Sequence, residues 1–157
     1  MNTKIRGVAV NNMITFKQFY EKNVVGLVET IFIDGVGEVE AKIDSGNGAF
    51  NVLHGENIEM NEEVCRFITV DGKKIEKPIV DIITINVGAG NFEERPVVEF
   101  SIKFGTKQFD NVKFSIGNRA NNEYPVLIGK DFIRNDLDAL IDVDGVNLFD
   151  QNIEVDY

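Results

Sequence analysis

Short apolar or alternating segments, separated by glycine-containing turns, make up most of the chain. Residues 24–33 (VVGLVETIFI) are apolar and β-branched, and residues 38–44 (EVEAKID) alternate between polar and apolar side chains. Both patterns favour strands, and the intervening Asp34-Gly35-Val36-Gly37 has the composition of a tight turn. The pattern therefore predicts a hairpin over residues 24–44.

The same signals recur along the chain. We predict two more hairpins and one polar loop, as follows: a hairpin of residues 64–70 and 75–87 around Asp71-Gly72, a Gly-rich loop over residues 86–95, and a hairpin of residues 96–104 and 109–116 across Gly105-Thr106. Asp-Gly pairs are favoured in primed two-residue turns, and clusters of glycine and polar residues favour loops.

Two short helices and a last hairpin complete the predicted elements. Thr15 is a candidate cap for a helix over residues 16–23, whose aromatic side chains fall on one face. Residues 124–129 (YPVLIG) read as a buried strand that ends at its glycine, and a helix over 130–136 (KDFIRND) follows. Residues 137–149 are predicted as a hairpin around Asp144-Gly145. About eight or nine strands and two helices indicate a mainly β barrel or sandwich.

Composition narrows the class of protein. The chain has 157 residues and a formal net charge of -10, with no cluster of Lys and Arg, which argues against a nucleic-acid partner. No segment approaches the roughly 18 apolar residues of a membrane span, and no signal peptide is recognisable, so we expect a cytoplasmic protein. One cysteine, Cys65, and one histidine, His54, exclude a disulfide framework and the usual zinc sites. We expect no metal or cofactor, although a purely carboxylate metal site remains open, and we expect Cys65 to be a packing residue.

Asp44 stands at an unusual place, at the end of an apolar strand and before Ser45 and Gly46. An Asp-Ser-Gly turn needs no function, because Asp and Ser bond nearby backbone and Gly supplies unusual dihedral angles. The preceding strand, however, has the small apolar side chains of a buried element. A carboxylate that emerges from such a strand costs free energy unless its partners are prepared.

Asp44-Ser45-Gly46, followed much later by Leu127-Ile128-Gly129 and a short helix, resembles the active-site elements of retropepsin-like aspartic proteases. Among these, the chain is most similar to a small family found beside ATP-grasp peptide ligases and often labelled "ATP-dependent zinc protease". The matching pieces are AKIDSG, LH at 53–54, EERPVV, FDNVKFSI, VLIGKDFI at 126–133 and LIDVDG. They run in the same order over residues 42–145.

The resemblance implies a closed acid-protease barrel of about six to eight strands. It also implies an aspartic endopeptidase that cleaves peptide or protein substrates with Asp44 as the catalytic acid/base. Since the chain has one such tripeptide, Asp44 must meet its copy in a homodimer. The residues expected to support the active-site loop are Ser45, Gly46, His54, Leu127, Ile128 and Gly129. The flap candidates are the Asp71-Gly72 hairpin first and the Gly88-Ala89-Gly90 loop second. The expected divisions are an N-terminal extension (1–22), the protease domain (23–150) and an acidic tail (151–157).

The chain departs from this family at Asn47 and Gly48, where an alanine and a basic residue are usual. The zinc in the family label has no support in a chain with one His and one Cys. Two other functions stay open: a catalytically inactive structural or interaction module in a larger assembly such as a virion, and a partner of an ATP-grasp ligase. A triad of Ser45, His54 and an Asp is disfavoured, because Ile43 stands where a nucleophile elbow requires glycine.

Overall fold

A computed structural model describes residues 22–149. The acidic tail and all but the last two residues of the helix expected over 16–23 lie outside this range. Of these two residues, Asn23 already begins the first strand.

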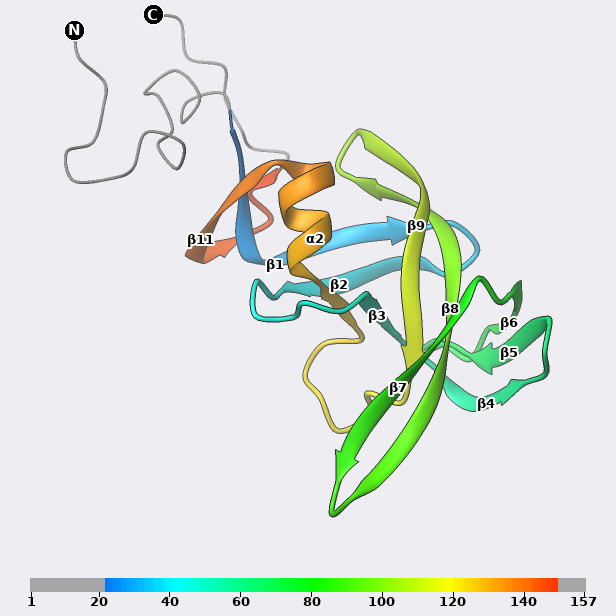
Figure 1. The fold of residues 1–157 in the computed structure, drawn as a ribbon. Coiled ribbons are helices and arrows are strands. Elements are labelled where there is room, and N and C mark those ends of the chain that lie inside the picture. The colour runs from blue at the N-terminus through cyan, green and yellow to red at the C-terminus, as the bar shows by residue number, and fades with distance from the viewer. Residues whose placement is uncertain (1–21, 150–157) are drawn as a thin grey trace, which may run out of the picture.

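Strands dominate the described residues, as the sequence predicts (Figure 1). The elements are β1 (Asn23–Ile33), β2 (Gly37–Ile43), β3 (Asn51–His54), β4 (Glu56–Met60), β5 (Val64–Ile68), β6 (Lys74–Pro78), β7 (Asp81–Gly88), β8 (Asn91–Phe104), β9 (Lys107–Gly117), β10 (Val126–Ile128), α2 (Lys130–Phe132), the π-helical turn η2 (Ile133–Leu137) and β11 (Ala139–Val146). One short helical segment therefore follows the strand of YPVLIG, as expected.

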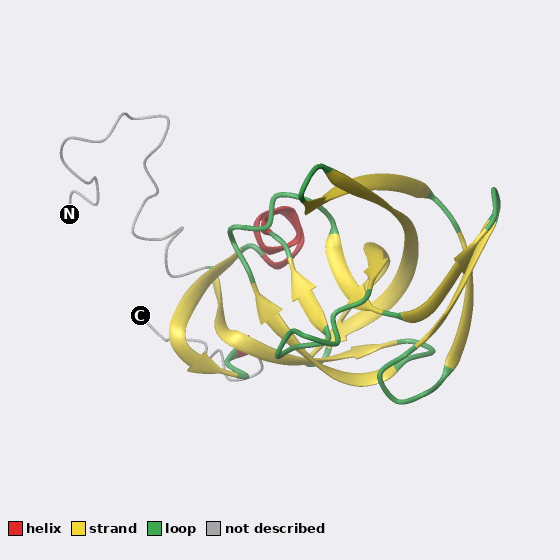
Figure 2. Cartoon of the chain, turned by 90° about the horizontal axis from the view of Figure 1, so that it is seen from below, coloured by secondary structure: helices red, strands yellow, loops and turns green. Residues whose placement is uncertain are grey.

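The main sheet contains a ring of strands. Strand β1 pairs with β2, β2 with β10, β10 with β3, β3 with β9, β9 with β8, and β8 again with β1. Strand β11 joins this ring beside β1 and β7 joins it beside β8, which gives an eight-stranded sheet, and β4, β5 and β6 form a separate three-stranded sheet. Figure 2 shows the strands curving around a common centre.

The three hairpins predicted from glycine-containing turns form as antiparallel pairs: β1 with β2, β5 with β6, and β8 with β9. Each turn contains a glycine with positive φ: 83° at Gly35, 82° at Gly72 and 57° at Gly105. Side chains other than glycine rarely adopt this backbone conformation, which is why local sequence predicts these turns well.

Residues 75–87, predicted as one strand, are two. The Ile79 N–H donates to the Glu63 carbonyl and the Val80 N–H donates to the Val97 carbonyl, each at 2.8 Å. The chain therefore leaves its partner β5 at this point and joins β8. The predicted loop over residues 86–95 is also wrong, because it is the end of the β7–β8 hairpin. Polar composition misled the prediction, since much of this hairpin is exposed.

The predicted last hairpin around Asp144-Gly145 is wrong as well. Residues 139–146 form the single strand β11, which runs parallel to β1. Glycines allow the two backbones to approach closely, since a Cβ added at Gly26 would lie 2.4 Å from the Gly145 carbonyl oxygen. Such long-range backbone contacts cannot be read from local sequence. Strands β3 and β4, which the sequence analysis did not identify, depend on similarly distant partners.

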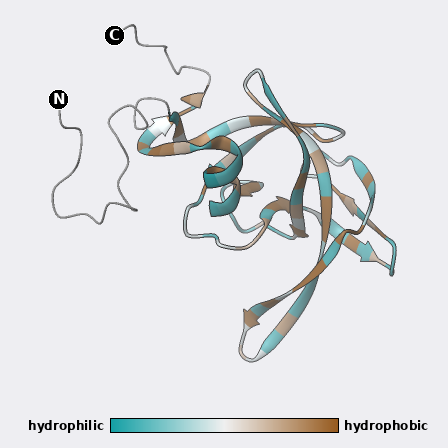
Figure 3. Cartoon of the chain, turned by 45° about the horizontal axis from the view of Figure 1, so that its top comes forward, coloured by the Kyte–Doolittle hydropathy of each residue, from teal (hydrophilic) through white to brown (hydrophobic). Residues whose placement is uncertain are grey.

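The core is aromatic and β-branched. Figure 3 shows apolar and polar residues alternating along many of the strands. Phe104 packs against Phe132 of α2 at a centroid distance of 5.7 Å and against Phe149 at 5.6 Å, which fixes the helix and the end of the described chain to the sheet. Cys65 is fully buried, and burial raises the pKa of its thiol to about 11. Within residues 22–149, no helix is long and apolar enough to cross a membrane.

Candidate active site

Asp44 lies directly after β2, where this strand runs parallel to β10 with Ile43 beside Ile128. Its backbone N–H donates to the Ile128 carbonyl at 2.9 Å, and its half-buried carboxylate accepts the Gly46 N–H through Oδ1 at 3.0 Å. The transition from strand to loop therefore places this carboxylate at the edge of the ring of strands. The two sequence elements of the predicted loop, Asp44-Ser45-Gly46 and Leu127-Ile128-Gly129, lie together.

Gly129 allows the Asp44 loop to rest on the start of the helix. A Cβ added at Gly129 would lie 3.0 Å from the carbonyl oxygens of both Asn47 and Ala49. The Asn47 carbonyl accepts the Lys130 N–H at 2.9 Å, while its side chain bonds the backbone of Ala49 and Phe50. At the position where the resembled family carries alanine, this chain therefore has a residue that braces the loop internally.

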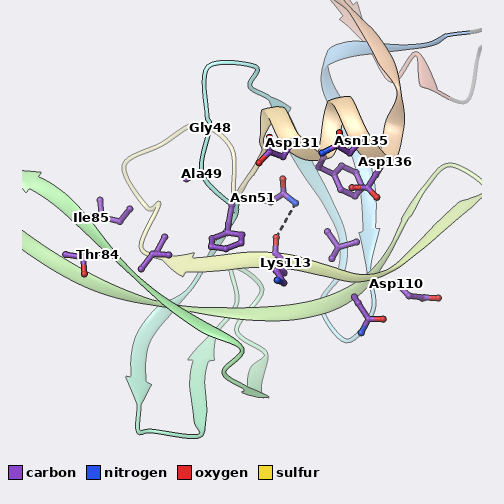
Figure 4. Close-up of a pocket in the computed structure, with 15 residues that line it drawn as sticks. Gly48, Ala49, Asn51, Thr84, Ile85, Asp110, Lys113, Asp131, Asn135 and Asp136 are labelled. Atoms are coloured by element: carbon purple, nitrogen blue, oxygen red, sulfur yellow. Dashed lines mark hydrogen bonds between the residues drawn. The ribbon is translucent and has the colours of Figure 1, made fainter.

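Asn51, which the sequence analysis missed, joins three elements under the same loop. Its side chain is 5% exposed, and its Oδ1 accepts the Gly129 N–H at 2.8 Å. Its Nδ2 donates to the Lys113 carbonyl of β9 at 3.2 Å, a bond visible in Figure 4. The only signal in the sequence is a polar residue at the head of an apolar segment.

His54 supports a different loop from the one predicted. Its Nδ1 accepts the backbone N–H of Arg119 at 2.8 Å, and its backbone N–H donates to the Pro125 carbonyl at 2.8 Å. Nε2 faces Glu56 Oε1 at 3.3 Å, and the residue is 4% exposed. His54 thus holds the 118–125 loop, which connects β9 to β10, and within the described residues it makes no hydrogen bond to the Asp44 loop.

Arg119 is a second residue that sequence reasoning missed. Burial lowers the pKa of its guanidinium, the nearby Arg95 lowers it further, and Asp44 raises it, so both groups are within electrostatic reach. Its Nε donates to the Tyr124 carbonyl at 3.0 Å. Arg95 projects from β8 over Gly117, where an added Cβ would lie 2.9 Å from the Arg95 Cζ. Asp44 therefore has at least one arginine, Arg119, within electrostatic reach in a strongly acidic chain.

The two flap candidates lie in very different places. Lys73, beside the Asp71-Gly72 turn, donates from Nζ to the Val36 carbonyl at 2.8 Å. That turn therefore lies against the β1–β2 turn, at the opposite end of β2 from Asp44. Gly88 and Gly90 instead form the turn of the β7–β8 hairpin, which projects from the body in Figure 1.

A cavity of about 500 Å³ separates the β7–β8 hairpin from the Asp44 loop and the helix (Figure 4). Residues 48–51 line one side and residues 83–85 of β7 line another. Apolar side chains include Phe50, Ile85 and Phe132, and the carboxylates of Asp131 and Asp136 lie along the helix. The hollow begins only four positions after Asp44 and is bordered by one strand of the projecting hairpin.

Comparison with known proteins assigns the family. Residues 24–149 match the RimB-like family, described as "Retropepsin-like aspartic endopeptidase RimB". The chain belongs to the RimB-like family. A crystal structure of a protein of unknown function (DUF785) from Legionella pneumophila subsp. pneumophila str. Philadelphia 1 is 27% identical to this RimB-like chain, with a TM-score of 0.64. The similarity covers 79% of this chain and 95% of that chain. No curated protein matches the chain.

The remaining predicted site residue of the RimB-like chain, Ser45, is exposed. It lines a second hollow of about 310 Å³ together with Lys130 and Arg134 of the helix. His54 bonds elsewhere, so the described contacts do not bring the two residues together as a triad. Within residues 22–149 there is also no group of three His, Cys, Asp or Glu side chains arranged to hold a metal ion.

Proposed function

We propose that this RimB-like chain is an aspartic endopeptidase that acts as a homodimer through two Asp44 carboxylates. The observation that carries the proposal is the half-buried Asp44 carboxylate on a loop braced by Gly46, Asn47 and Gly129. A loop fixed by this many backbone contacts can hold a reacting carboxylate in one place, which acid–base catalysis requires. Family membership supports the same reaction class.

The proposed chemistry needs two copies of the chain. Two carboxylates side by side cannot both ionise easily, so the pair shares one proton. One carboxylate takes a proton from the attacking water, while the protonated carboxylate donates a hydrogen bond to the substrate carbonyl. The exposed Ser45 and Gly46 stand beside Asp44, where they would contact the partner loop and support the pair.

We assign the role of the flap to the β7–β8 hairpin. We assign the role of the substrate groove to the cavity of about 500 Å³ between this hairpin and residues 48–51. Strand β7 borders the cavity beside residues 48–51, whereas the Asp71-Gly72 turn lies at the far end of β2. Two apolar side chains near the hairpin end are unusually exposed, Val87 at 53% and Phe92 at 68%. A hairpin of this kind would bury its apolar end against a bound peptide.

Charge suggests which peptides bind. Arg119 lies within electrostatic reach of Asp44 and of a second arginine, Arg95, in a chain of net charge -10. Arginine binds carboxylates in a bidentate geometry, so we propose that substrates carry an acidic residue close to the cleaved bond.

The first test is Asp44→Asn, assayed against a peptide library at mildly acidic and neutral pH. Asparagine keeps the size of the side chain and its capacity to accept the Gly46 N–H, so the fold should survive while cleavage is lost. The matched control is Asp71→Asn, in the β5–β6 turn that lies near the opposite end of β2 from Asp44. It should retain full activity. Undiminished cleavage by Asp44→Asn would refute the assignment.

The homodimer has its own test. Subunits of the wild type and of Asp44→Asn are mixed in equal amounts and allowed to exchange. If each active site needs two Asp44 residues, only about one quarter of the dimers are fully active. Activity equal to half of the wild-type value would instead indicate independent subunits. A folded chain that cleaves nothing would favour the alternative, an inactive interaction module.

A further inference from the structure

The protonation state of His54 follows from its partners. Nδ1 accepts a hydrogen bond from the Arg119 backbone N–H at 2.8 Å. A backbone amide can only donate, so Nδ1 carries no proton, and the ring is the neutral tautomer protonated on Nε2. Nε2 faces the acceptor Glu56 Oε1 at 3.3 Å, which agrees with this assignment. The environment of a buried histidine therefore selects one tautomer.

This bond fixes the backbone of a residue whose charge is partly buried. Arg119 is partly desolvated and close to Arg95, and both effects disfavour its charge, whereas Asp44 favours it. A guanidinium in such a place tends to move toward solvent unless it is anchored. The anchors are at its backbone, through His54, and at its Nε, through the Tyr124 carbonyl. Most of the remaining 118–125 loop is exposed.

We propose that His54 is a positioning residue whose unprotonated Nδ1 holds Arg119 within electrostatic reach of Asp44, and that the guanidinium binds an acidic group of the substrate. The inference rests on the proposed function, because it gives Arg119 a substrate to bind. His54 itself contacts neither the substrate nor the Asp44 loop. It acts by fixing the course of the backbone that delivers the arginine.

Two substitutions of His54 distinguish the contact made by Nδ1 from the contact made by Nε2. In His54→Asn, the amide oxygen can occupy the position of Nδ1 and accept the Arg119 N–H. In His54→Gln, the amide lies toward the position of Nε2, so the contact with Glu56 is retained and the contact with Arg119 is lost. Thermal unfolding of both variants reports their effect on the fold. An acidic peptide and its amide counterpart, with Asn and Gln in place of Asp and Glu, are the two substrates.

We expect His54→Gln to lose about 10-fold in kcat/KM for the acidic peptide relative to the amide peptide, the range of one hydrogen bond to a charged group. His54→Asn should keep the wild-type preference. In an Arg119→Met background, His54→Gln should cause no further loss of preference, because residues that act through one another are not additive. The proposal would be overturned if His54→Asn and His54→Gln lost the preference for the acidic peptide equally. It would also be overturned if His54→Gln caused the full loss of preference in the Arg119→Met background.

A second measurement does not depend on catalysis. The chain contains one histidine, so its ring nitrogens give unambiguous NMR signals. A proton on Nε2 at neutral pH supports the bond to Arg119, and a proton on Nδ1 overturns it. If the wild type cleaves no peptide, the proposed function is wrong, but the role of Arg119 can still be tested. The test is then the binding of the same two peptides to the Asp44→Asn variant. Equal binding of both peptides would then refute that role.

Discussion

Asn51 shows how much of the site depends on single buried side chains. Both ends of its amide are used, one by the Gly129 N–H and one by the Lys113 carbonyl. These bonds connect the head of β3 with the start of the helix and with β9. A buried amide with its hydrogen bonds satisfied stabilises little by itself, but its removal leaves the two partners unsatisfied.

We therefore expect Asn51→Ala to lower the free energy of unfolding by about 1–3 kcal/mol. Urea denaturation measures the change. The control is Asn122→Ala in the exposed 118–125 loop, where no side-chain bond is lost. Equal urea midpoints for the two variants would show that the Asn51 bonds contribute nothing.

At this scale the sequence predicts part of the candidate site. The pairing of Asp44 with Gly129 follows from a resemblance in which both segments keep their spacing and order. Asn51 and Arg119 were missed because their roles depend on partners distant in sequence, 78 positions away for Asn51 with Gly129 and 65 for Arg119 with His54. A polar residue at the head of an apolar segment marks Asn51 as unusual, but the residue types do not indicate which distant partners it or Arg119 would contact.

At the scale of elements, the same distinction separates correct from incorrect predictions. The β1–β2 and β5–β6 hairpins are defined by their own turn residues and were predicted. Strand β11 is defined by a parallel partner that begins 116 positions earlier, as the pair of Asn23 and Ala139 shows. The β7–β8 hairpin was missed because its exposed, glycine-containing end, residues 86–95, resembles a loop.

The end of the β7–β8 hairpin should matter for substrate binding and not for folding. Phe92 is 68% exposed, so Phe92→Ala should change the unfolding free energy by no more than about 0.5 kcal/mol. If the hairpin closes over peptide, the same change should raise KM by roughly five-fold, the effect of about 1 kcal/mol at a binding contact.

Steady-state kinetics with the acidic peptide measures this effect. Phe32→Ala is the matched control, since Phe32 is also exposed, at 44%, but lies near the β1–β2 turn. A rise in KM of the same size in both variants would argue against a flap.

The end of the described chain is held by one buried carboxylate. Glu29 is 3% exposed and accepts the backbone N–H groups of Gly26, Leu148 and Phe149 at 2.8, 2.7 and 3.2 Å. Glu29→Gln replaces one acceptor oxygen by a donor and so leaves at least one N–H without a partner.

We expect Glu29→Gln to cost about 1–3 kcal/mol of unfolding free energy. Chemical denaturation checks this value. Backbone hydrogen exchange should also quicken at Leu148 and Phe149 before the rest of the chain opens. Glu40→Gln, an exposed glutamate on neighbouring β2, should leave both measurements unchanged. Unaltered exchange at the two amides in Glu29→Gln would rule out the role assigned to Glu29.

For the whole molecule, charge sets the conditions under which two copies meet. Each chain carries a formal charge of -10, so the proposed dimer brings together two strongly acidic bodies. Their long-range repulsion opposes association and is screened by salt. The proposed attraction between an acidic peptide and Arg119 is weakened by the same screening.

Salt should therefore act in opposite directions on the two equilibria. Raising ionic strength from about 0.01 M to about 0.1 M shortens the screening length from about 30 Å to about 10 Å. We expect the dimer to tighten in sedimentation experiments, while KM for the acidic peptide rises and KM for the amide peptide changes little. If the dimer instead weakens with added salt, the interface between the two chains would be held together by opposite charges.

The burial of Cys65 has a practical consequence. Its thiol is fully enclosed and its pKa is raised to about 11, so it stays protonated and unreactive near neutral pH. The native cysteine should therefore not react with a thiol-directed label, so it does not need to be removed before site-directed labelling. A single cysteine introduced at the end of the β7–β8 hairpin, for example at Asn91, would take up one spin label per chain. The distance between labels in a dimer would then follow the opening and closing of the hairpins directly.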